Sequence, residues 1–292
     1  MSEGRYAVRL DRDVVSGRGP DAGSYLQGQL SQDVTALPDG GSAWSWLLAP
    51  TGKVDALLRV TRLSAEDWLL DTDAGWGPVV AARLDRFRLR TKVDFVPRDL
   101  AVIGLRGPGW EEAAASSGAA AVASPPWPGI TGADLMGAEA LPAGWPELAL
   151  STYEVVRIRA GIPRMGAELD ERTIPGETGL VAFTVSFTKG CYTGQELVAR
   201  IDSRGGNVAR RLRGIRPADP TGAGIASVAA PFEAPADLVT ADGTPAGVLT
   251  SAAGATGEGW VGLGYIRRGV DPDADLHVAG SDIRVQQVEP PF

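Results

Sequence analysis

Cysteine and histidine are almost absent from this sequence of 292 residues, which contains one of each, Cys191 and His277. A single cysteine cannot form a disulfide within the chain, and a structural zinc site needs several cysteine or histidine ligands. A serine–histidine–aspartate triad would have to use His277, whose strand-like surroundings are typical of an ordinary packed or exposed side chain. The sequence therefore excludes disulfide-rich scaffolds and the usual zinc sites.

Lysine is also scarce, so nearly all of the positive charge is carried by arginine. Lysine occurs at three positions, and the net charge is −8, so the basic footprint of a general nucleic-acid binder is missing. No run of about 18 apolar residues is present. The N-terminal segment 1–13 is polar and lacks the apolar core of a secretory signal. We therefore expect a cytoplasmic protein that binds neither nucleic acid directly nor a membrane.

The first two thirds of the chain alternate between helical and strand patterns. Apolar residues make up 44% of the sequence, which is enough for a substantial core. Leu26, Leu30 and Val34 recur at helical spacing and predict a helix over residues 24–37. The pattern that follows predicts strands at 43–49, 54–61 and 68–71, a helix at 75–90 and a strand at 92–96. This order is typical of a compact α+β unit.

The last third changes in character. Short strands are predicted at 212–215, 237–240, 248–251, 260–266, 275–278 and 283–287, with a hairpin turn at 241–244. Such closely spaced short strands indicate a small antiparallel β-barrel. We therefore expect an α+β region over residues 1–206, composed of two interleaved domains, and a barrel domain over residues 207–292.

One segment concentrates the chemically interesting residues. Lys189–Glu196, with the sequence KGCYTGQE, follows an apolar run at 180–187 that predicts a strand. It precedes a helical pattern at 197–201, and Thr193 with Glu196 matches a capping box. Gly190 and Gly194 would give the turn between strand and helix its conformational freedom.

Cys191 would lie just before the start of that helix. The partial positive charge of a helix N-terminus and the nearby Lys189 both favour a thiolate, which makes Cys191 a candidate reactive or metal-binding thiol. The alternative is a buried cysteine that acts as a small apolar filler. The residues alone leave both interpretations open.

The segment resembles the signature K-G-C-[FY]-x-G-Q-E of the YgfZ family. Further stretches agree with that family: Leu26–Val34 with L-Q-G-Q-x-[ST]-N-D-V (Gln32 in place of Asn), Pro50–Val54 with its glycine turn, Arg157–Pro163 with R-x-x-x-G-I-P, and Pro175–Glu177 with P-x-E. Together these matches span about residues 24–212.

The resemblance implies the fold of the glycine-cleavage T-protein, an aminomethyltransferase that uses tetrahydrofolate. It implies three domains around a central channel, with a ferredoxin-like α+β N-terminal part and a C-terminal antiparallel barrel. It also implies bound tetrahydrofolate or a derivative, and a role in assembling or repairing iron–sulfur clusters of client enzymes, including enzymes that modify tRNA. Iron–sulfur client or assembly proteins would then be the partners.

Residue roles follow from the same resemblance. Cys191 would be the functional thiol, supported by Lys189, and would contact a cluster transiently, because a stable cluster normally takes four ligands. The predicted folate contacts are Arg157, Glu177, Tyr192, Gln195 and Asp55. Three of them have an ordinary alternative: Arg157 lies on the polar face of a predicted helix, Glu177 in a loop, and Tyr192 could be a core aromatic.

Two departures bear on catalysis. The T-protein has a pair of aspartates where this chain has Asp55 followed by Ala56. It also has a pterin-binding glutamate that is missing from the stretch Thr131–Asp134. With these acids incomplete, aminomethyl transfer is disfavoured. Two alternatives remain: a folate-dependent one-carbon transferase or demethylase, and an interaction protein that has lost folate binding.

Overall fold

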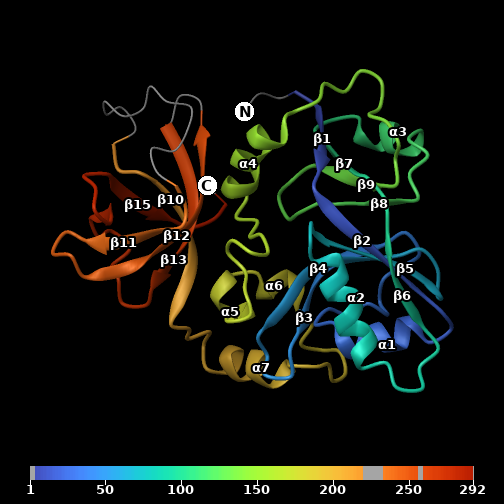
Figure 1. Ribbon diagram of the computed structural model, residues 1–292. Helices are drawn as coiled ribbons and strands as arrows, with labels where there is room; N and C mark the ends of the chain where they lie inside the picture. The colour runs from blue at the N-terminus through green and yellow to red at the C-terminus, as the bar shows by residue number, and fades with distance from the viewer. Residues whose placement is uncertain (1–3, 220–232, 256–258, 292) are drawn as a thin grey trace. The chain divides into compact units, whose positions relative to one another are not determined.

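The structure is a computed structural model that describes residues 4–219, 233–255 and 259–291 (Figure 1). The chain divides into two compact units. The first comprises Met1–Leu150, Glu171–Pro175 and Leu180–Arg200, and the second comprises Ser151–Asp170, Gly176–Gly179 and Ile201–Phe292. The predicted division into residues 1–206 and 207–292 stays a prediction.

The first unit contains a five-stranded antiparallel sheet in the order β3-β4-β5-β2-β6. The strands are β2 (Arg12–Arg18), β3 (Ser42–Leu48), β4 (Val54–Arg62), β5 (Asp67–Asp73) and β6 (Asp94–Arg98). Helices α1 (Ala22–Gln29) and α2 (Gly77–Arg86) pack on one face of this sheet. Leu26 of α1 and Leu84 of α2 are fully buried there against Leu58 and Leu70, because alternate strand residues point to the same face.

A second, four-stranded sheet completes the first unit. Its order is β1-β7-β9-β8, built from β1 (Tyr6–Leu10), β7 (Val102–Arg106), β9 (Gly132–Met136) and β8 (Ala121–Ala123). Helix α3 (Trp110–Ala115) packs on it through a core that includes Ile103, Leu105 and Leu135. Val102 and Met136 join Val14 and Leu69 of the first sheet in a shared cluster, so the two sheets pack against each other.

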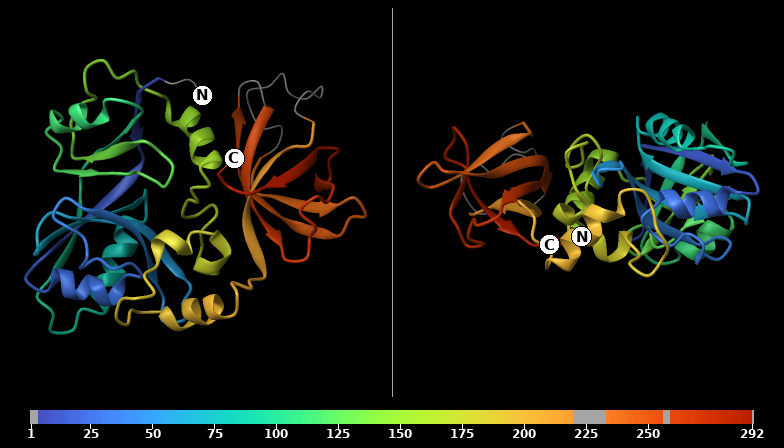
Figure 2. Two further views of the ribbon diagram at one scale, coloured as in Figure 1. Left: turned by 180° about the vertical axis from the view of Figure 1, so that it is seen from behind. Right: turned by 90° about the horizontal axis from the view of Figure 1, so that it is seen from below.

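The second unit contains the barrel that the sequence predicts. Its six strands close in the order β10-β13-β12-β11-β14-β15. Figure 2 shows this part of the chain in orange and red from two further sides. They are β10 (Arg210–Pro217), β11 (Ala236–Thr240), β12 (Pro245–Ala255), β13 (Gly259–Arg267), β14 (Leu276–Val278) and β15 (Arg284–Val288). Every pairing is antiparallel. One apolar core, with Ile215, Leu249 and Val285 among its members, draws residues from all six strands.

Helix α4 (Leu150–Arg159) lies against the outside of the barrel. Val155 and Ile158 pack with Leu212, Leu263 and Tyr265 in a cluster separate from the barrel core. The remaining helices are short: α5 (Pro175–Thr178), α6 (Val181–Thr184) and α7 (Gln195–Ser203). In the described part of the chain, no helix has the length and apolar character needed to cross a membrane.

Two predicted elements were wrong. The helix predicted over residues 24–37 ends at Gln29. Leu30 is extended and forms a β-bridge with Leu47, and bends and turns follow it. The strand predicted over residues 180–187 is instead the short helix α6 followed by irregular chain. Inside α6, the hydroxyl of Thr184 bonds the Leu180 carbonyl and accepts the indole N–H of Trp46, which holds this segment in place.

Candidate functional site

Three stretches that are far apart in the sequence meet in the first unit. They are the end of α1, the turn between β3 and β4, and residues Lys189–Gly194, which we call the signature loop. The backbone N–H of Thr193 donates to the Gly28 carbonyl at 3.1 Å, and that of Ser186 donates to the Ser31 carbonyl at 3.0 Å. Each stretch carries part of the sequence resemblance, so the matching motifs form one local structure.

Lys189 fastens the signature loop to the end of α1. Its ammonium donates to the carbonyl oxygens of Gln27 at 2.6 Å, Leu30 at 2.7 Å and Gln32 at 2.8 Å. These bonds use all three of its hydrogens. Burial lowers the pKa of Lys189 to about 8, while the Asp33 carboxylate opposes that shift. The side chain is therefore mainly charged at neutral pH and acts as a clamp between two segments of the chain.

Two glycines allow the signature loop to approach the β3–β4 turn. Gly52 has φ +80° and Gly194 has φ +82°, a left-handed conformation that residues with a Cβ adopt at a cost. A Cβ on Gly52 would lie 2.5 Å from the Cβ of Leu197, and one on Gly194 would lie 2.6 Å from the Ala49 carbonyl oxygen. Any larger residue at either position would separate the two segments.

The predicted capping box does not form. Helix α7 begins at Gln195, and the Thr193 N–H that Glu196 would have accepted donates to Gly28 instead. The Gln195 side-chain oxygen accepts the N–H of Tyr192 at 3.2 Å and closes the turn before the helix. Tyr192 is buried, which raises the pKa of its hydroxyl to about 12, and its ring lies 5.3 Å from the Lys189 nitrogen.

Cys191 is exposed at the tip of this clamped loop. Exposure rules out the alternative of a buried apolar filler and leaves the sulfur accessible to reagents or partners. Among the described residues, no group of three or more histidine, cysteine, aspartate or glutamate side chains is arranged to hold a metal ion. A thiol in this position can make a single bond to a metal or to another sulfur.

Asp55 is linked to the same structure through Arg83. The guanidinium of Arg83 on α2 donates to the Asp55 carboxylate at 2.8 Å, the Leu48 carbonyl at 2.7 Å and the Gln29 side chain at 3.3 Å. Gln29 in turn lies 3.5 Å from the Thr193 hydroxyl. Asp55 therefore already has a cationic partner within the protein.

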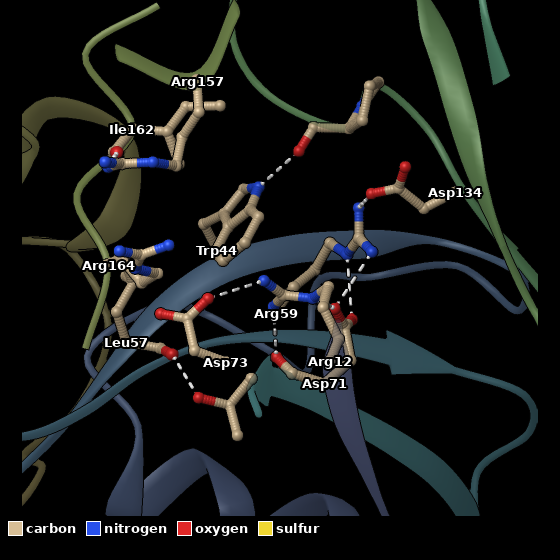
Figure 3. Close-up of polar contacts among 12 residues, drawn as sticks. Arg12, Trp44, Leu57, Arg59, Asp71, Asp73, Asp134, Arg157, Ile162 and Arg164 are labelled. Carbon is tan, nitrogen blue, oxygen red and sulfur yellow. Dashed lines mark hydrogen bonds and ion pairs between the residues drawn. The ribbon is translucent and has the colours of Figure 1, made fainter. Parts of the chain in front are cut away.

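A buried charge network on the neighbouring strands was not foreseen from the sequence. Arg59 on β4, 1% exposed, binds Asp71 on β5 through its Nε at 3.0 Å and Asp134 on β9 at 2.8 Å (Figure 3). Arg12 adds a contact to Asp71 at 2.6 Å, and Arg106 lies 2.8 Å from Asp134. Burial disfavours the Asp134 carboxylate, but Arg106 and Arg59 outweigh it and hold its pKa below the usual value.

Trp44 on β3 borders this network. The guanidinium carbons of Arg12 and Arg59 lie 5.1 and 5.3 Å from its ring centroid, and its indole N–H donates to the Pro126 carbonyl at 2.9 Å (Figure 3). Trp127 packs edge-on against it at 4.9 Å between ring centroids. A half-buried indole next to guanidinium groups can stack on a flat ring system. Because its members come from distant strands, local sequence patterns give no signal for this cluster.

Arg157 belongs to the second unit, where it is almost fully buried. Its guanidinium bonds Glu154 at 2.6 and 2.9 Å, Glu168 at 3.1 Å and the Ile162 carbonyl at 2.5 Å. Glu168 also accepts the hydroxyls of Thr250 at 2.8 Å and Ser251 at 2.5 Å from β12. Arg157 therefore ties α4 and the loop after it to the barrel.

Glu177 is buried in the same unit beside an unsatisfied hydroxyl. It accepts a bond from Arg210 Nε at 3.2 Å, and the Arg210 guanidinium lies 4.1 Å from the Tyr265 ring centroid. The Tyr265 hydroxyl is buried and has no hydrogen-bond partner among the described residues. Burial raises its pKa, and Glu177 and Glu168 add to the rise while Arg210 opposes it. The hydroxyl thus keeps its proton and can donate it to an acceptor.

The structure therefore divides the predicted site residues between two places. Lys189, Cys191, Tyr192 and Gln195 form one loop in the first unit, with Asp55 connected to it through Arg83. Arg157 and Glu177 lie in the second unit. Their proposed roles toward a ligand stay predictions, whereas their internal partners are now known.

Known proteins give this geometry a context. No family model matches the chain. An uncharacterized protein of Haemophilus influenzae is 28% identical over 281 residues, which cover 96% of this chain and 95% of the relative. The tRNA-modifying protein YgfZ of Pectobacterium atrosepticum is 31% identical over 212 residues, covering 65% of this chain and 63% of the relative. The chain is thus similar to members of the YgfZ family over about two thirds of its length.

A more distant relative is an iron–sulfur cluster assembly factor IBA57 homolog from Neurospora crassa mitochondria. It is 27% identical over 218 residues, covering 66% of this chain and 49% of the relative. The alignments thus span less than two thirds of the YgfZ protein from Pectobacterium and about half of this mitochondrial relative.

The fold expected for the YgfZ family is confirmed by a solved structure. The aminomethyltransferase T of the glycine cleavage system from Bartonella henselae superposes with a TM-score of 0.80, covering 99% of this chain and 86% of that protein. The two sequences are 20% identical, so this likeness shows the fold alone. The predicted T-protein-like α+β fold with a C-terminal antiparallel barrel is therefore correct.

Proposed function

We propose that the protein assists the assembly or repair of iron–sulfur clusters in client enzymes, including enzymes that modify tRNA, with Cys191 as its functional thiol. Two kinds of relative support this proposal, since one is named a tRNA-modifying protein and the other an iron–sulfur cluster assembly factor. The partners would be iron–sulfur client or assembly proteins, and the setting would be the cytoplasm.

The observation that carries the proposal is the exposed Cys191 on a clamped loop. Three bonds from Lys189 and the close approach of Gly52 and Gly194 hold the backbone on either side of the thiol. A fixed, accessible sulfur suits brief contact with a cluster, an iron ion or a partner thiol. One cysteine cannot replace the several ligands that a resident cluster requires.

Tetrahydrofolate is part of the proposal, and some of the residues predicted to contact it are better suited to bind it than others. Glu177 and the unsatisfied Tyr265 hydroxyl offer an acceptor and a donor, which suits the polar edge of a pterin. Arg157 and Asp55 fit less well, because Glu154, Glu168 and Arg83 already neutralise them. Folate would supply a flat heterocycle and carboxylates, and these residues would bind and orient it.

Folate-dependent one-carbon transfer is the second candidate, favoured by the aminomethyltransferase fold. It is weakened by the Asp55–Arg83 ion pair and by the apolar Ala56 that follows Asp55, because a proton-transferring acid should be free to reach its substrate. The third candidate, an interaction protein without folate, predicts no tetrahydrofolate affinity.

Anaerobic calorimetry with tetrahydrofolate tests the ligand. Wild type and Cys191→Ala should bind with similar affinity, because the thiol has a separate role, whereas Tyr265→Phe and Glu177→Gln should bind at least tenfold more weakly. Arg284→Ala, an exposed change elsewhere on the barrel, is the control and should bind like wild type. Absence of binding by wild type would leave the interaction protein as the surviving interpretation.

The cluster role has an independent test. In a strain lacking its own YgfZ-type protein, wild type should restore the activities of [4Fe–4S] enzymes, and Cys191→Ser should fail although it accumulates to the same level. Ser151→Ala, at an exposed position on α4, is a control of similar size and should restore activity fully. Full rescue by Cys191→Ser would refute the thiol role but not folate binding.

A further inference from the structure

A small hollow opens at one end of the barrel, where β10 begins and β13 ends. Arg211 and Arg213 lie four and two residues before the core residue Ile215 on β10, so they point to the barrel interior beyond its apolar part. Arg211 is paired in register with Ile266, another core residue. The hollow has a volume of about 160 Å³.

Four arginines line this hollow in a protein whose net charge is −8. They are Arg211 and Arg213 of β10, Arg267 at the end of β13, and Arg268 immediately after it. The side chain of Gln287 from β15 also contributes to the wall. The apolar floor consists of Ile266 and Val270, which belong to the barrel core or pack against it.

Most of this positive charge is not neutralised. Within the part of the chain that the structure describes, the guanidiniums of Arg267 and Arg268 have no carboxylate partner, and both residues are exposed. Arg211 donates to the Gly206 carbonyl at 2.8 Å, which is an uncharged partner. Arg213 alone of the four pairs with a carboxylate, Glu289 at 2.9 Å.

One acid, Glu289, contacts the lining residue Arg213, and its side chain is exposed. No aspartate or glutamate is among its described lining residues. The carboxylate of Asp271, in the loop that borders the hollow, accepts the N–H of Asp273 at 2.9 Å and so caps its own turn. The carbonyl of Asp271 receives the Gln287 amide at 3.0 Å, which fixes that side of the wall.

We propose that this hollow, which we call the arginine mouth, binds the phosphate group of a small phosphorylated ligand. Arginine forks bind phosphate oxygens in pairs of hydrogen bonds, and several guanidiniums in one place favour an anion with two or more charges over a single carboxylate. The volume fits a phosphate or diphosphate group, whereas whole drug-sized ligands occupy sites of roughly 300 Å³ or more. Barrel mouths are recurrent ligand positions.

This site is separate from the residues proposed for folate and for the thiol. The arginine mouth shares no residue with Cys191, Glu177 or Tyr265, so loss of phosphate binding would leave the proposed function untouched, and the reverse also holds. The phosphate could come from free inorganic diphosphate or from a phosphate ester, and the two sources share the same recognition chemistry.

Calorimetry with the full-length protein at low ionic strength tests the proposal, with inorganic pyrophosphate and a nucleoside diphosphate as separate probes. Wild type should bind at least one of them with 1:1 stoichiometry. The double change Arg267→Ala/Arg268→Ala should weaken binding at least tenfold. The affinity of Arg267→Lys/Arg268→Lys should lie between those of wild type and the double alanine variant, because the charge remains but the paired hydrogen bonds are lost.

Matched arginines on the same barrel provide the control. Arg216→Ala/Arg284→Ala also removes two exposed charges, but neither residue lines the hollow, and binding should stay within twofold of wild type. Equal losses in both double variants would overturn the site in favour of diffuse electrostatic attraction. The proposal would also fail if neither probe bound, or if single-stranded RNA bound with affinity rising with length while the small probes did not.

Discussion

The ammonium of Lys189 lies 2.7 Å from the carbonyl oxygen of Leu30, the residue that follows helix α1. Together with the bonds to Gln27 and Gln32, this contact joins the signature loop to a helix more than 150 residues earlier in the chain. The same carbonyls lie where the helix pattern predicted from the sequence breaks off. The carbonyl oxygens at the end of the helix thus accept the hydrogen bonds of the lysine ammonium.

Removing the Lys189 ammonium should loosen the signature loop. Lys189→Met keeps the length of the side chain but leaves three carbonyls without their donor, and we expect a loss of about 2 kcal/mol in the free energy of unfolding. Urea denaturation at pH 7 measures it. Lys53→Met, at an exposed position, is the control and should change stability by less than about 0.5 kcal/mol. Equal effects of the two changes would contradict the clamp.

Gly52 should tolerate no side chain. Gly52→Ala combines a left-handed backbone with a contact of 2.5 Å to the Leu197 Cβ, and we expect a loss of about 3 kcal/mol, of which about 1 comes from the backbone alone. Gly40→Ala isolates that backbone contribution, because Gly40 has φ +81° with open space around it. Thermal unfolding of both variants gives the comparison, and the interpretation fails if they are equally stable.

The buried network around Asp134 should make stability depend on pH. Its pKa is lowered in the folded protein, so its stabilising contribution is complete above the ordinary aspartate value near 4 and is lost as the pH falls through the lower folded value. Asp134→Asn should therefore cost about 3–5 kcal/mol at pH 7, because Arg106 loses its ion pair with Asp134 and Arg59 keeps only Asp71 of its two carboxylate partners. Chemical denaturation should show a smaller difference in stability between wild type and Asp134→Asn at pH 3 than at pH 7. A stability difference that is the same at both pH values would mean that Asp134 is not ionised in the folded protein.

Cys191 should react in the folded protein. Because it is exposed and no other cysteine is present, an aromatic disulfide reagent should titrate one thiol per chain without denaturant, and absorbance follows the reaction directly. Cys191→Ser supplies the blank. A thiol that reacts in denaturant but not in buffer would contradict the exposed position and weaken the proposed cluster contact.

The outcome for α1 shows what periodicity can and cannot reveal. Leu26, Leu30 and Val34 are all completely buried, as their spacing predicts, yet Leu26 alone of the three lies in the helix. The spacing correctly predicted which residues are buried. The backbone conformation is set instead by hydrogen bonds to distant segments, including the bond from the Ser31 hydroxyl to the Thr184 carbonyl at 2.6 Å. The barrel was more predictable, because each of its short strands is a local pattern, and three of its six pairings join strands that are consecutive in the chain.

In the candidate site too, local features were predicted from the sequence, and contacts between distant segments were not. The local resemblance at Lys189–Glu196 identified the loop and its cysteine, but not the partners of Lys189, which lie on another segment. The network of Arg59, Asp71 and Asp134 was missed because three separate strands bring it together. The Tyr265 hydroxyl was missed because an unsatisfied donor can be recognised only when its surroundings are known.

The path of the chain between the two units limits how the protein can be divided. It passes from one unit to the other between residues 150 and 151, 170 and 171, 175 and 176, 179 and 180, and 200 and 201. A single cut in the chain therefore cannot release either unit intact. A gene fragment that encodes one unit would either include part of the other unit or lack part of its own. The crossing between residues 179 and 180 separates Glu177 from Cys191, so the proposed ligand contact and the proposed thiol belong to different units yet lie only 14 residues apart in the chain.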